Sequence, residues 1–333
     1  MNVPDLIPHY RNQRVLVTGG LGFIGSNLAR RLVDMGARVT VLDALVPNFG
    51  GNQFNLDGYA DKLCVVLGDL REPRVVDEVV REQSFIFNLA GQVSHLDSMR
   101  DPFTDLEINC RSQLDLLEAC RQYNPGVRIV YASTRQVYGR PRELPVDEDH
   151  PLAPIDINGI HKLAAGWYHV LYHDVYGLRS TSLRMTNTYG PRMRVVDSRQ
   201  TFLGLWIRQV IDGAELLVFG DGQQKRDFNY VDDVVQAMLL TAVSAATEGQ
   251  AYNLGGLEVI TLLDLAKLLV ELHRTGSYRL VPFPPERKPI DIGDYAGNYS
   301  RLQKAIGWEP SVTLRSGLVR TLDYYRRHRK SYW

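Results

Sequence analysis

The sequence predicts an α/β fold in which a parallel sheet is covered by helices on both faces. Through the first 190 residues, short runs rich in β-branched residues alternate with amphipathic helical stretches. The short runs are apolar throughout, as expected for strands that are buried on both faces. Parallel neighbours need crossover connections, and right-handed helical crossovers place the helices over the sheet.

Six strands and the helices between them can be placed in order. The expected strands are residues 14–20, 38–43, 63–70, 85–90, 127–134 and 179–187. Helices are expected over residues 24–36 and 106–120, where apolar residues recur at helical spacing. Another helix is expected to contain "NGIHK", in which Asn158 and Lys162 are four residues apart and therefore share one face.

The alternation of strands and helices ends after about residue 190. Loops, short strands and helices follow, including "LLDLAKLLVELH" and the proline-rich "VPFPPERKP". We expect residues 1–190 to form a sheet domain and residues 191–333 to form mainly a smaller subdomain that binds the substrate. This subdomain would close over the carboxyl edge of the sheet, where such folds bind ligands. Residue 190 is an approximate boundary, because the chain could cross between the lobes more than once.

Composition argues against several classes of function. The 38 basic and 38 acidic residues cancel, so the overall charge indicates neither nucleic acid nor an acidic membrane as a partner. No apolar run approaches membrane-spanning length, and the first residues lack the apolar segment of a signal peptide. Cys64, Cys110 and Cys120 show no metal-ligand spacing, so we expect no metal and reduced thiols in the cytoplasm.

A glycine-rich turn between the first strand and the first helix predicts a dinucleotide site. "VLVTGGLGFIG" places Gly19, Gly22 and Gly25 in this turn, together with Phe23 and Ile24. The first glycine permits a tight turn, the second lets the backbone approach a pyrophosphate, and the third lets the helix pack close to the strand. The positive end of the helix would then face the phosphates, as in a Rossmann-type fold.

Asp43 ends the second expected strand and indicates which dinucleotide binds. A carboxylate there accepts hydrogen bonds from the adenosine ribose hydroxyls and repels a 2′-phosphate. The expected cofactor is therefore NAD and not NADP. Asp69 and Leu70 follow the third strand and are weaker candidates for the cofactor site, since an aspartate there also forms turns.

Further motifs, in order along nearly the whole chain, resemble those of one family. They are the glycine spacing with "GFIG" inside it, "NLAGQVS" at 88–94, "STRQVYG" at 133–139, "LRMTNTYGPR" at 183–192, "DGQQKRDFNYVDD" at 221–233 and "IGWEP" at 306–310. The chain is similar to the extended short-chain dehydrogenases/reductases that modify nucleotide-activated sugars, in the UDP-glucose 4-epimerase-like branch. The resemblance implies further cofactor contacts at Leu89, Ala90, Asn109, Ser133 and Lys162, and packing of the nicotinamide against Tyr189 and Pro191.

The resemblance also implies the chemistry of the first step. NAD takes a hydride from the sugar, usually from C4, while a base takes the hydroxyl proton. The usual shuttle is a strand serine or threonine, a helix tyrosine, and a lysine four residues later that lowers the pKa of the tyrosine. Thr134 matches the first role and Lys162 the third. Asn158 stands at the tyrosine position, and its amide has no titratable proton near pH 7.

Another group must therefore act as the base. Lys162, acting directly or through Thr134, ranks first if it is desolvated. His161 ranks second as the base because the pKa of a histidine lies in a useful range. It could equally be a residue of the helix surface or of a dimer interface. Tyr138 usually packs structurally in the family. His95 follows the fourth strand and would face the sugar. It could act as the base or could equally form only a hydrogen bond to the substrate.

Arg135 and Gln136 bear on the type of reaction. The 4,6-dehydratases of the family carry an aspartate and a glutamate at these positions, and loss of water across C5–C6 needs both carboxyl groups. The decarboxylases keep the glutamate. We therefore expect epimerisation through a transient 4-keto sugar. The alternatives are an oxidoreductase that releases the 4-keto sugar, and a non-catalytic protein that binds NAD and a nucleotide sugar.

The resemblance implies several contacts to a nucleotide-diphosphate sugar. Asn187 matches an asparagine of the family, and Arg226 matches an arginine that contacts the diphosphate or the nucleotide. Arg192 and Arg287 add positive charge for a pyrophosphate, although Arg287 could equally be a solvated loop charge. Arg135 could clasp a carboxylate on the sugar, and a structural ion pair is the alternative.

Two helical stretches indicate self-association. Residues 106–120 and 161–173 are apolar over more of their circumference than a one-sided surface helix needs. In the family, the corresponding helices pair across a twofold axis as a four-helix bundle. We expect a homodimer, although burial within one subunit would give the same pattern.

Overall fold

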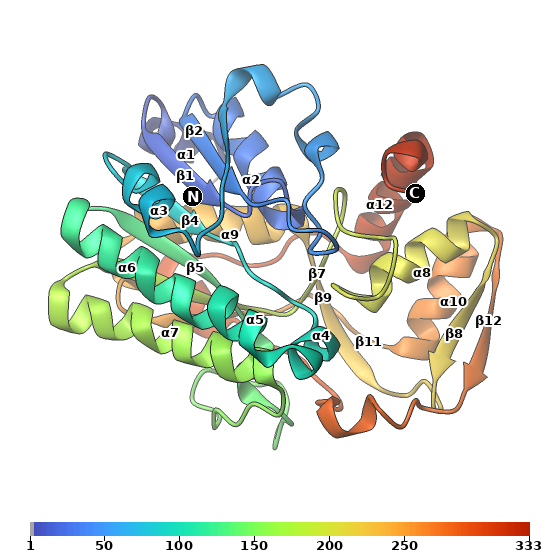
Figure 1. Ribbon diagram of the computed structural model, residues 1–333. Coiled ribbons are helices and arrows are strands. Elements are labelled where there is room, and N and C mark those ends of the chain that lie inside the picture. Colours follow the sequence, from blue (N-terminus) through green and yellow to red (C-terminus); the bar gives the residue numbers. More distant parts are fainter. Residues whose placement is uncertain (1–2) are drawn as a thin grey trace.

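The computed structural model describes residues 3–333, and its main feature is a seven-stranded sheet in the order β10-β6-β5-β4-β1-β2-β3 (Figure 1). Every neighbouring pair in this sheet is parallel. The strands are β1 (Arg14–Thr18), β2 (Arg38–Asp43), β3 (Cys64–Leu67), β4 (Phe85–Asn88), β5 (Arg128–Thr134), β6 (Arg179–Met185) and β10 (Ala251–Leu254). The first six lie within the ranges expected from the sequence, which confirms the predicted fold class.

Helices cover both faces of the large sheet. One face packs against α1 (Val3–Tyr10), α2 (Phe23–Asp34) and α9 (Val231–Val243), and the other against α3 (Pro73–Val79), α6 (Ser112–Tyr123) and α7 (Ile157–Tyr176). Strand residues alternate between the two cores: Val15 and Val17 of β1 belong to the first, and Leu16 belongs to the second. Because both faces are buried, the strand is apolar at successive positions.

The smaller lobe lies beside the carboxyl edge of the sheet, at the right in Figure 1. It contains α8 (Phe202–Ile211), β8 (Glu215–Phe219), α10 (Leu262–His273) and β12 (Ser277–Val281), with β8 and β12 paired in parallel. A three-stranded sheet has the order β11 (Val259–Thr261), β9 (Lys225–Tyr230) and β7 (Asn187–Tyr189). The remaining helices are α4 (His95–Arg100), α5 (Pro102–Leu106), α11 (Ser300–Ile306) and α12 (Leu314–His328).

The chain crosses between the lobes more than once. After residue 190 it returns to the large sheet, where α9 packs against α2 and β5 and where β10 pairs with β6. Residues 231–254 therefore belong to the sheet lobe. A single cut at residue 190 does not separate the two lobes.

The topology places a ligand site near the middle of the large sheet. β1 lies between β2 and β4, so the strand order reverses at this point, and such folds bind ligands outside the carboxyl ends of the strands there. Within residues 3–333, no helix combines the length and the apolar character needed to cross a bilayer. The same residues contain no group of three His, Cys, Asp or Glu side chains placed to hold a metal ion.

Candidate active site

One cavity lies at the carboxyl ends of the central strands and contains most of the expected site residues. Of the residues expected to bind the cofactor, those lining it are Gly19, Gly22, Phe23, Ile24, Gly25, Asp43, Asp69, Leu70, Leu89, Ala90, Ser133 and Lys162. Of those expected to act on or bind the sugar, the lining contains Thr134, Asn158, His95, Arg135 and Asn187. The glycine turn, the start of α7 and the end of β5 thus meet in one space.

Two glycines of the glycine turn, Gly19 and Gly25, have no room for a side chain. Gly19 has a φ of +65°, and a Cβ there would lie 2.9 Å from the backbone nitrogen of Ala90. A Cβ on Gly25 would lie 2.3 Å from the carbonyl oxygen of Gly19. Helix α2 begins after Gly22 without a side-chain cap. An uncapped helix start beside bare backbone is the arrangement that receives a phosphate.

Asp43 is held rigidly at the end of β2. Its two carboxylate oxygens accept hydrogen bonds from the backbone nitrogens of Leu21 (3.0 Å) and Leu45 (2.9 Å). Burial raises the pKa of this carboxyl group, and the two hydrogen bonds oppose that rise. The carboxylate is therefore fixed beside the glycine turn, where it can accept hydrogen bonds from a ribose.

Lys162 is buried on the sheet side of α7. Its Nζ lies 3.3 Å from the carbonyl oxygen of Ala132 and 5.0 Å from the centre of the Tyr131 ring. Burial lowers the pKa of the amine to about 8, although the negative charge of Asp105 opposes this shift. A Cβ on Gly91 would lie 2.8 Å from Nζ, so a glycine at residue 91 leaves the amine accessible from the cavity. Lys162 is therefore desolvated, which is the condition that we set for its role as the base.

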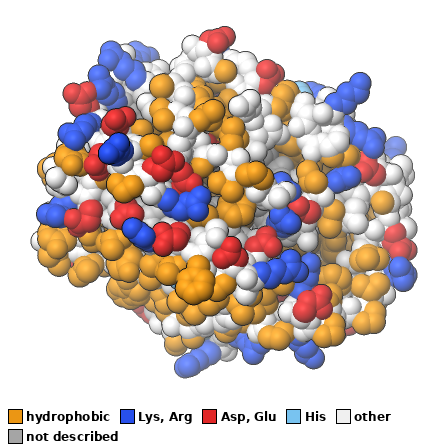
Figure 2. All heavy atoms as spheres, viewed as in Figure 1, with side chains coloured by type: hydrophobic (Ala, Val, Ile, Leu, Met, Phe, Trp, Pro, Cys, Tyr) orange, Lys and Arg blue, Asp and Glu red, His pale blue; other side chains and the backbone are white. Residues whose placement is uncertain are grey.

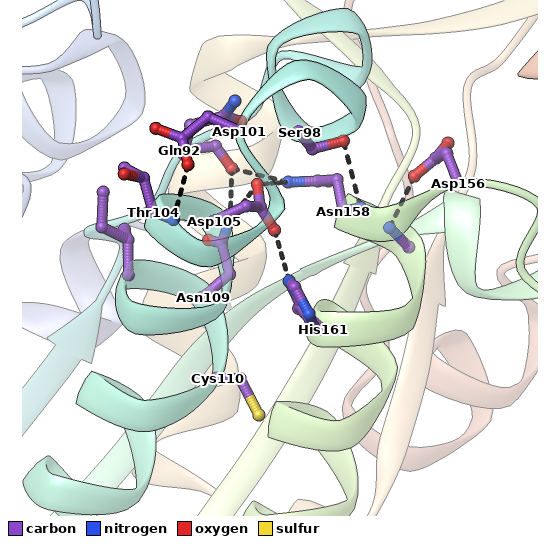
Figure 3. Close-up of polar contacts among 12 residues, drawn as sticks. Gln92, Ser98, Asp101, Thr104, Asp105, Asn109, Cys110, Asp156, Asn158 and His161 are labelled. Carbon is purple, nitrogen blue, oxygen red and sulfur yellow. Dashed lines mark hydrogen bonds and ion pairs between the residues drawn. The ribbon is translucent and has the colours of Figure 1, made fainter.

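Asn158 belongs to a buried polar network at the start of α7 (Figure 3). The Asn158 amide nitrogen donates to the carbonyl oxygen of Gln92 (2.8 Å) and to Oδ2 of Asp105 (3.2 Å). The amide nitrogen of Asn109 donates to the same two acceptors, at 2.9 and 3.0 Å. Because a carboxylate only accepts, both amide groups must point their nitrogens toward Asp105. Both amide hydrogens of Asn158 therefore bind acceptors within the protein.

Two candidate bases have structural partners and do not line the cavity. Nδ1 of His161 lies 2.7 Å from Oδ1 of Asp105, so this ring completes the network. The Tyr138 hydroxyl donates to Oδ1 of Asn253 (2.6 Å) and accepts from Arg184 (2.8 Å) deep in the core. Neither group faces the space where a substrate would lie.

Asn109 does not line the cavity but lies directly behind its wall. It belongs to a π-helical turn, Glu107–Arg111, that interrupts the predicted helix over residues 106–120. A Cβ on Gly91 would lie 2.8 Å from Oδ1 of Asn109, which is buried without a hydrogen-bond partner. Such turns are frequent at functional sites, and no local pattern in the sequence signals this one.

Tyr189 and Pro191, the residues expected to pack against the nicotinamide, do not line the cavity. Tyr189 is fully buried, and its hydroxyl donates to the carbonyl oxygen of Leu314 (3.2 Å). Pairing of β7 with β9 carries this ring into the core beneath α12. The carbonyl oxygen of Pro191 accepts from Asn27 (3.0 Å). Met185, Thr186 and Thr188 line the cavity in their place.

The structure also places three predicted substrate arginines outside the cavity lining. Arg226 is only 6% exposed, pairs with Asp291 at 3.4 Å and donates to the carbonyl oxygen of Gly293. Arg192 donates to Oδ1 of Asn27 (2.7 Å). The guanidinium of Arg287 lies over the ring of Phe219. Each of the three already has a partner within the fold.

Two loops add lining residues that the sequence did not indicate. Phe49 and Gly51 precede the third strand, and Gln200 and Thr201 precede α8. Nε2 of Gln200 donates to the carbonyl oxygen of Phe49 over 2.9 Å and ties the loops together. Since these loops are about 150 residues apart, no local pattern could reveal their contact.

The fold and the cavity define the class of protein: a dinucleotide-binding protein of the short-chain dehydrogenase/reductase type. A profile of the NAD dependent epimerase/dehydratase family matches residues 15–255, and the chain belongs to that family. Its cofactor is NAD. The residues present fit this cofactor, because the glycine turn leaves room for a pyrophosphate, Asp43 offers a carboxylate, and Lys162 is reachable past Gly91.

Individual relatives perform more than one reaction. The chain is 32% identical to a UDP-glucose 4-epimerase of Mycolicibacterium smegmatis, over 94% of this chain and 98% of that protein. It is also 32% identical to a dTDP-glucose 4,6-dehydratase of Streptomyces niveus, over 96% of this chain and 94% of that protein. The structure of Thermotoga maritima UDP-glucose 4-epimerase with UDP-glucose aligns with a TM-score of 0.86 at 31% identity, covering 95% of this chain and 99% of that one.

Proposed function

We propose that this protein is an NAD-dependent epimerase of a nucleotide-activated sugar that works through a transient 4-keto intermediate. The observation that supports this most directly is the single cavity that joins the glycine turn and Asp43 to Thr134 and Lys162. When bound, NAD supplies the hydride acceptor and donor. The chain's own residues hold the ribose, orient the sugar hydroxyl and move its proton.

The residues after Thr134 favour epimerisation over dehydration. Gln136 is buried and donates to Asp156 (3.0 Å), and Arg135 lines the cavity with a permanently charged group. Neither side chain can exchange a proton in the way that removal of water from a sugar requires. The relatives include enzymes of both kinds, so these two positions are the discriminating feature.

Arg135 indicates an acidic group on the substrate. Among the described residues it forms no ion pair; its guanidinium lies over the Tyr295 ring, 5.5 Å from the ring centre, and its Nε is buried without a hydrogen-bond partner. Burial lowers the pKa of this guanidinium, and the negative charge of Asp227 is the largest of the influences that oppose this shift. A guanidinium that lines a cavity without an ion pair favours a carboxylate ligand, so the proposed substrate class includes uronic acid derivatives.

We further propose a homodimer formed through α7 and the helices beside it. Ile160, Trp167, Leu171 and Val175 expose apolar side chains on α7, and Trp167 is 54% exposed. Phe103 on the neighbouring α5 is 77% exposed. Figure 2 shows hydrophobic side chains gathered along the lower left rim, where α7 runs in Figure 1. Such a contiguous apolar surface supports pairing with a second copy across a twofold axis.

The activity is tested by incubating the protein and NAD with a panel of UDP- and dTDP-activated hexoses and hexuronic acids. Product configuration is followed by NMR and NADH by absorbance. An epimer without net NADH supports the proposal. Accumulated NADH and ketone would indicate the oxidoreductase, a 4-keto-6-deoxy sugar would indicate a dehydratase, and tight binding without turnover would indicate a binding protein.

A further inference from the structure

A histidine and a buried aspartate meet at the wall of the cavity. His95 begins α4 and lines the cavity, with 35% of its side chain exposed. Its Nδ1 lies 3.2 Å from Oδ2 of Asp156, whose side chain is only 1% exposed. The two residues are 61 positions apart, and no local pattern links them in the sequence. Their contact is the arrangement in which a carboxylate orients an imidazole for proton transfer.

Asp156 is held in place by its other contacts. It is the N-cap of α7, and its Oδ1 accepts a hydrogen bond from the backbone nitrogen of Gly159 (2.6 Å). Its Oδ2 also accepts from Nε2 of Gln136 (3.0 Å). Burial favours the neutral acid, but these hydrogen bonds and the nearby imidazole hold the pKa of Asp156 below its ordinary value. The carboxylate therefore stays charged and fixed at the start of the helix that also bears Lys162.

The position of Asp156 determines which nitrogen of His95 can accept a proton. A charged carboxylate accepts hydrogen bonds only, so Nδ1 carries the ring proton where it faces Oδ2. The amide nitrogen of Gln136 lies 3.0 Å from the same oxygen and 3.4 Å from Nδ1 of His95, so its shorter contact is with the carboxylate. Nε2 is then the basic nitrogen. Among the described residues nothing forms a hydrogen bond with Nε2 of His95, and the ring lies at the cavity wall.

The other titratable groups are less suited to the reaction. His161 faces Asp105 and does not line the cavity. Nζ of Lys162 donates a hydrogen bond to the carbonyl oxygen of Ala132 (3.3 Å). Asn158 cannot titrate. His95 is the histidine that both lines the cavity and has a carboxylate partner.

We propose that His95, oriented by Asp156, is the general base that replaces the family's tyrosine. This inference rests on the proposed function. As the C4–H bond breaks and its electron pair passes with the hydrogen to the nicotinamide, the O–H bond breaks and its proton passes to Nε2 of His95. The sugar is oxidised to the ketone, NAD is reduced, and the imidazole becomes imidazolium. On re-reduction the same proton returns to the oxygen. Asp156 is a positioning residue that stabilises the imidazolium.

Kinetics of three variants test this role with a substrate that the wild type converts. His95→Gln preserves size and polarity but not basicity, and we expect kcat to fall about 100-fold or more with KM changed less than about threefold. Asp156→Asn keeps a good helix cap, so α7 should remain intact while kcat falls and KM holds. His273→Gln is the control, because His273 lies at the exposed end of α10, away from the cavity.

If the His95→Gln variant had the same kcat as the wild type, the inference would be overturned, but the proposed function would still stand. A large loss of kcat in His161→Gln with none in His95→Gln would assign the base to the other histidine. If the wild type converts no nucleotide sugar at all, the proposed function itself fails. The two failures are therefore distinguishable.

A spectroscopic measurement tests the dyad without turnover. In protein labelled with ¹⁵N-histidine, His95 is assigned by the signal missing from His95→Gln. We expect the neutral ring to be protonated at Nδ1 and unprotonated at Nε2 in the wild type, and to become a mixture of tautomers in Asp156→Asn. A wild-type ring protonated at Nε2 would contradict the proposal, because that nitrogen could not accept the substrate proton.

Discussion

The side-chain amide of Asn158 donates a hydrogen bond to the buried carboxylate of Asp105 over a distance of 3.2 Å. Asp105 also accepts from Asn109 and lies 2.7 Å from a ring nitrogen of His161, so three side chains surround it. Asn158 is therefore a structural support in this protein. It fixes the start of α7 against the loop after β4.

Replacing Asn158 by alanine should destabilise the protein. The change removes donors from a buried carboxylate and from the carbonyl of Gln92, and we expect the free energy of unfolding to fall by about 1–3 kcal/mol. Urea denaturation measures this loss. In an Asp105→Asn background, Asn158→Ala should lower the free energy of unfolding by a smaller amount. If the double-mutant cycle of these two changes showed no coupling energy, the contact between Asn158 and Asp105 would contribute nothing to stability.

Lys162 should make the stability of the cofactor-free protein depend on pH. Its folded-state pKa is about 8, below its ordinary value of 10.5. Between these values the unfolded chain binds more protons than the folded chain, so this group makes stability rise with pH. Lys162→Met should abolish that rise. Denaturant midpoints measured from pH 7 to 10.5 should diverge between the two proteins, and parallel curves would contradict the desolvated lysine.

Asp43 should determine the choice of cofactor. Asp43→Asn removes the negative charge that repels a 2′-phosphate and weakens the acceptor for the ribose hydroxyls. We expect NAD affinity to fall about tenfold or more, as for the loss of a hydrogen bond to a charged group, and the preference over NADP to shrink. Calorimetric titration with each cofactor measures both effects. An unchanged ratio of affinities would show that Asp43 does not select NAD.

Arg135 should select acidic sugars. Arg135→Gln is expected to weaken binding of UDP-glucuronic acid by about 10-fold to 100-fold, because a charged hydrogen-bond pair is lost. Binding of UDP-glucose should change little, which makes it the internal control. If the wild type binds the two ligands equally and the variant alters neither, the carboxylate assignment is wrong.

Trp167 should lie in the dimer interface. Trp167→Glu places a charge in the centre of the exposed apolar surface of α7, and we expect a monomer by sedimentation at micromolar concentration. Lys267→Glu, on the exposed face of α10, is the matched control and should leave the assembly unchanged. A wild-type monomer, or a variant that remains dimeric, would exclude this interface.

The parts of the site that depend on local pattern could be predicted from the sequence. The turn with Gly19 and Gly25, the carboxylate at the end of β2 and the register of Asn158 with Lys162 all follow from short segments whose geometry is set by neighbouring residues. The structure confirms the predicted strands and places most of the expected cofactor residues around one cavity.

The expected site residues that do not line the cavity include side chains whose direction depends on distant partners. Tyr189 lies on a motif next to the cavity but points into the core, because β7 pairs with β9. Arg226 was expected at a phosphate, yet its guanidinium is buried against Asp291. A motif indicates where the chain passes, but the direction of a long side chain is determined by what packs around it.

By itself, the sequence determined the doubly wound fold, the NAD site and the shared helix face of Asn158 and Lys162, because apolar pattern, turn geometry and helical spacing are local properties of the chain. Only the tertiary structure decided that Asn158 supports Asp105 and that His95 meets Asp156. These pairs join residues 53 and 61 positions apart, and the folding of α4, α5 and α7 against one another is what brings them together.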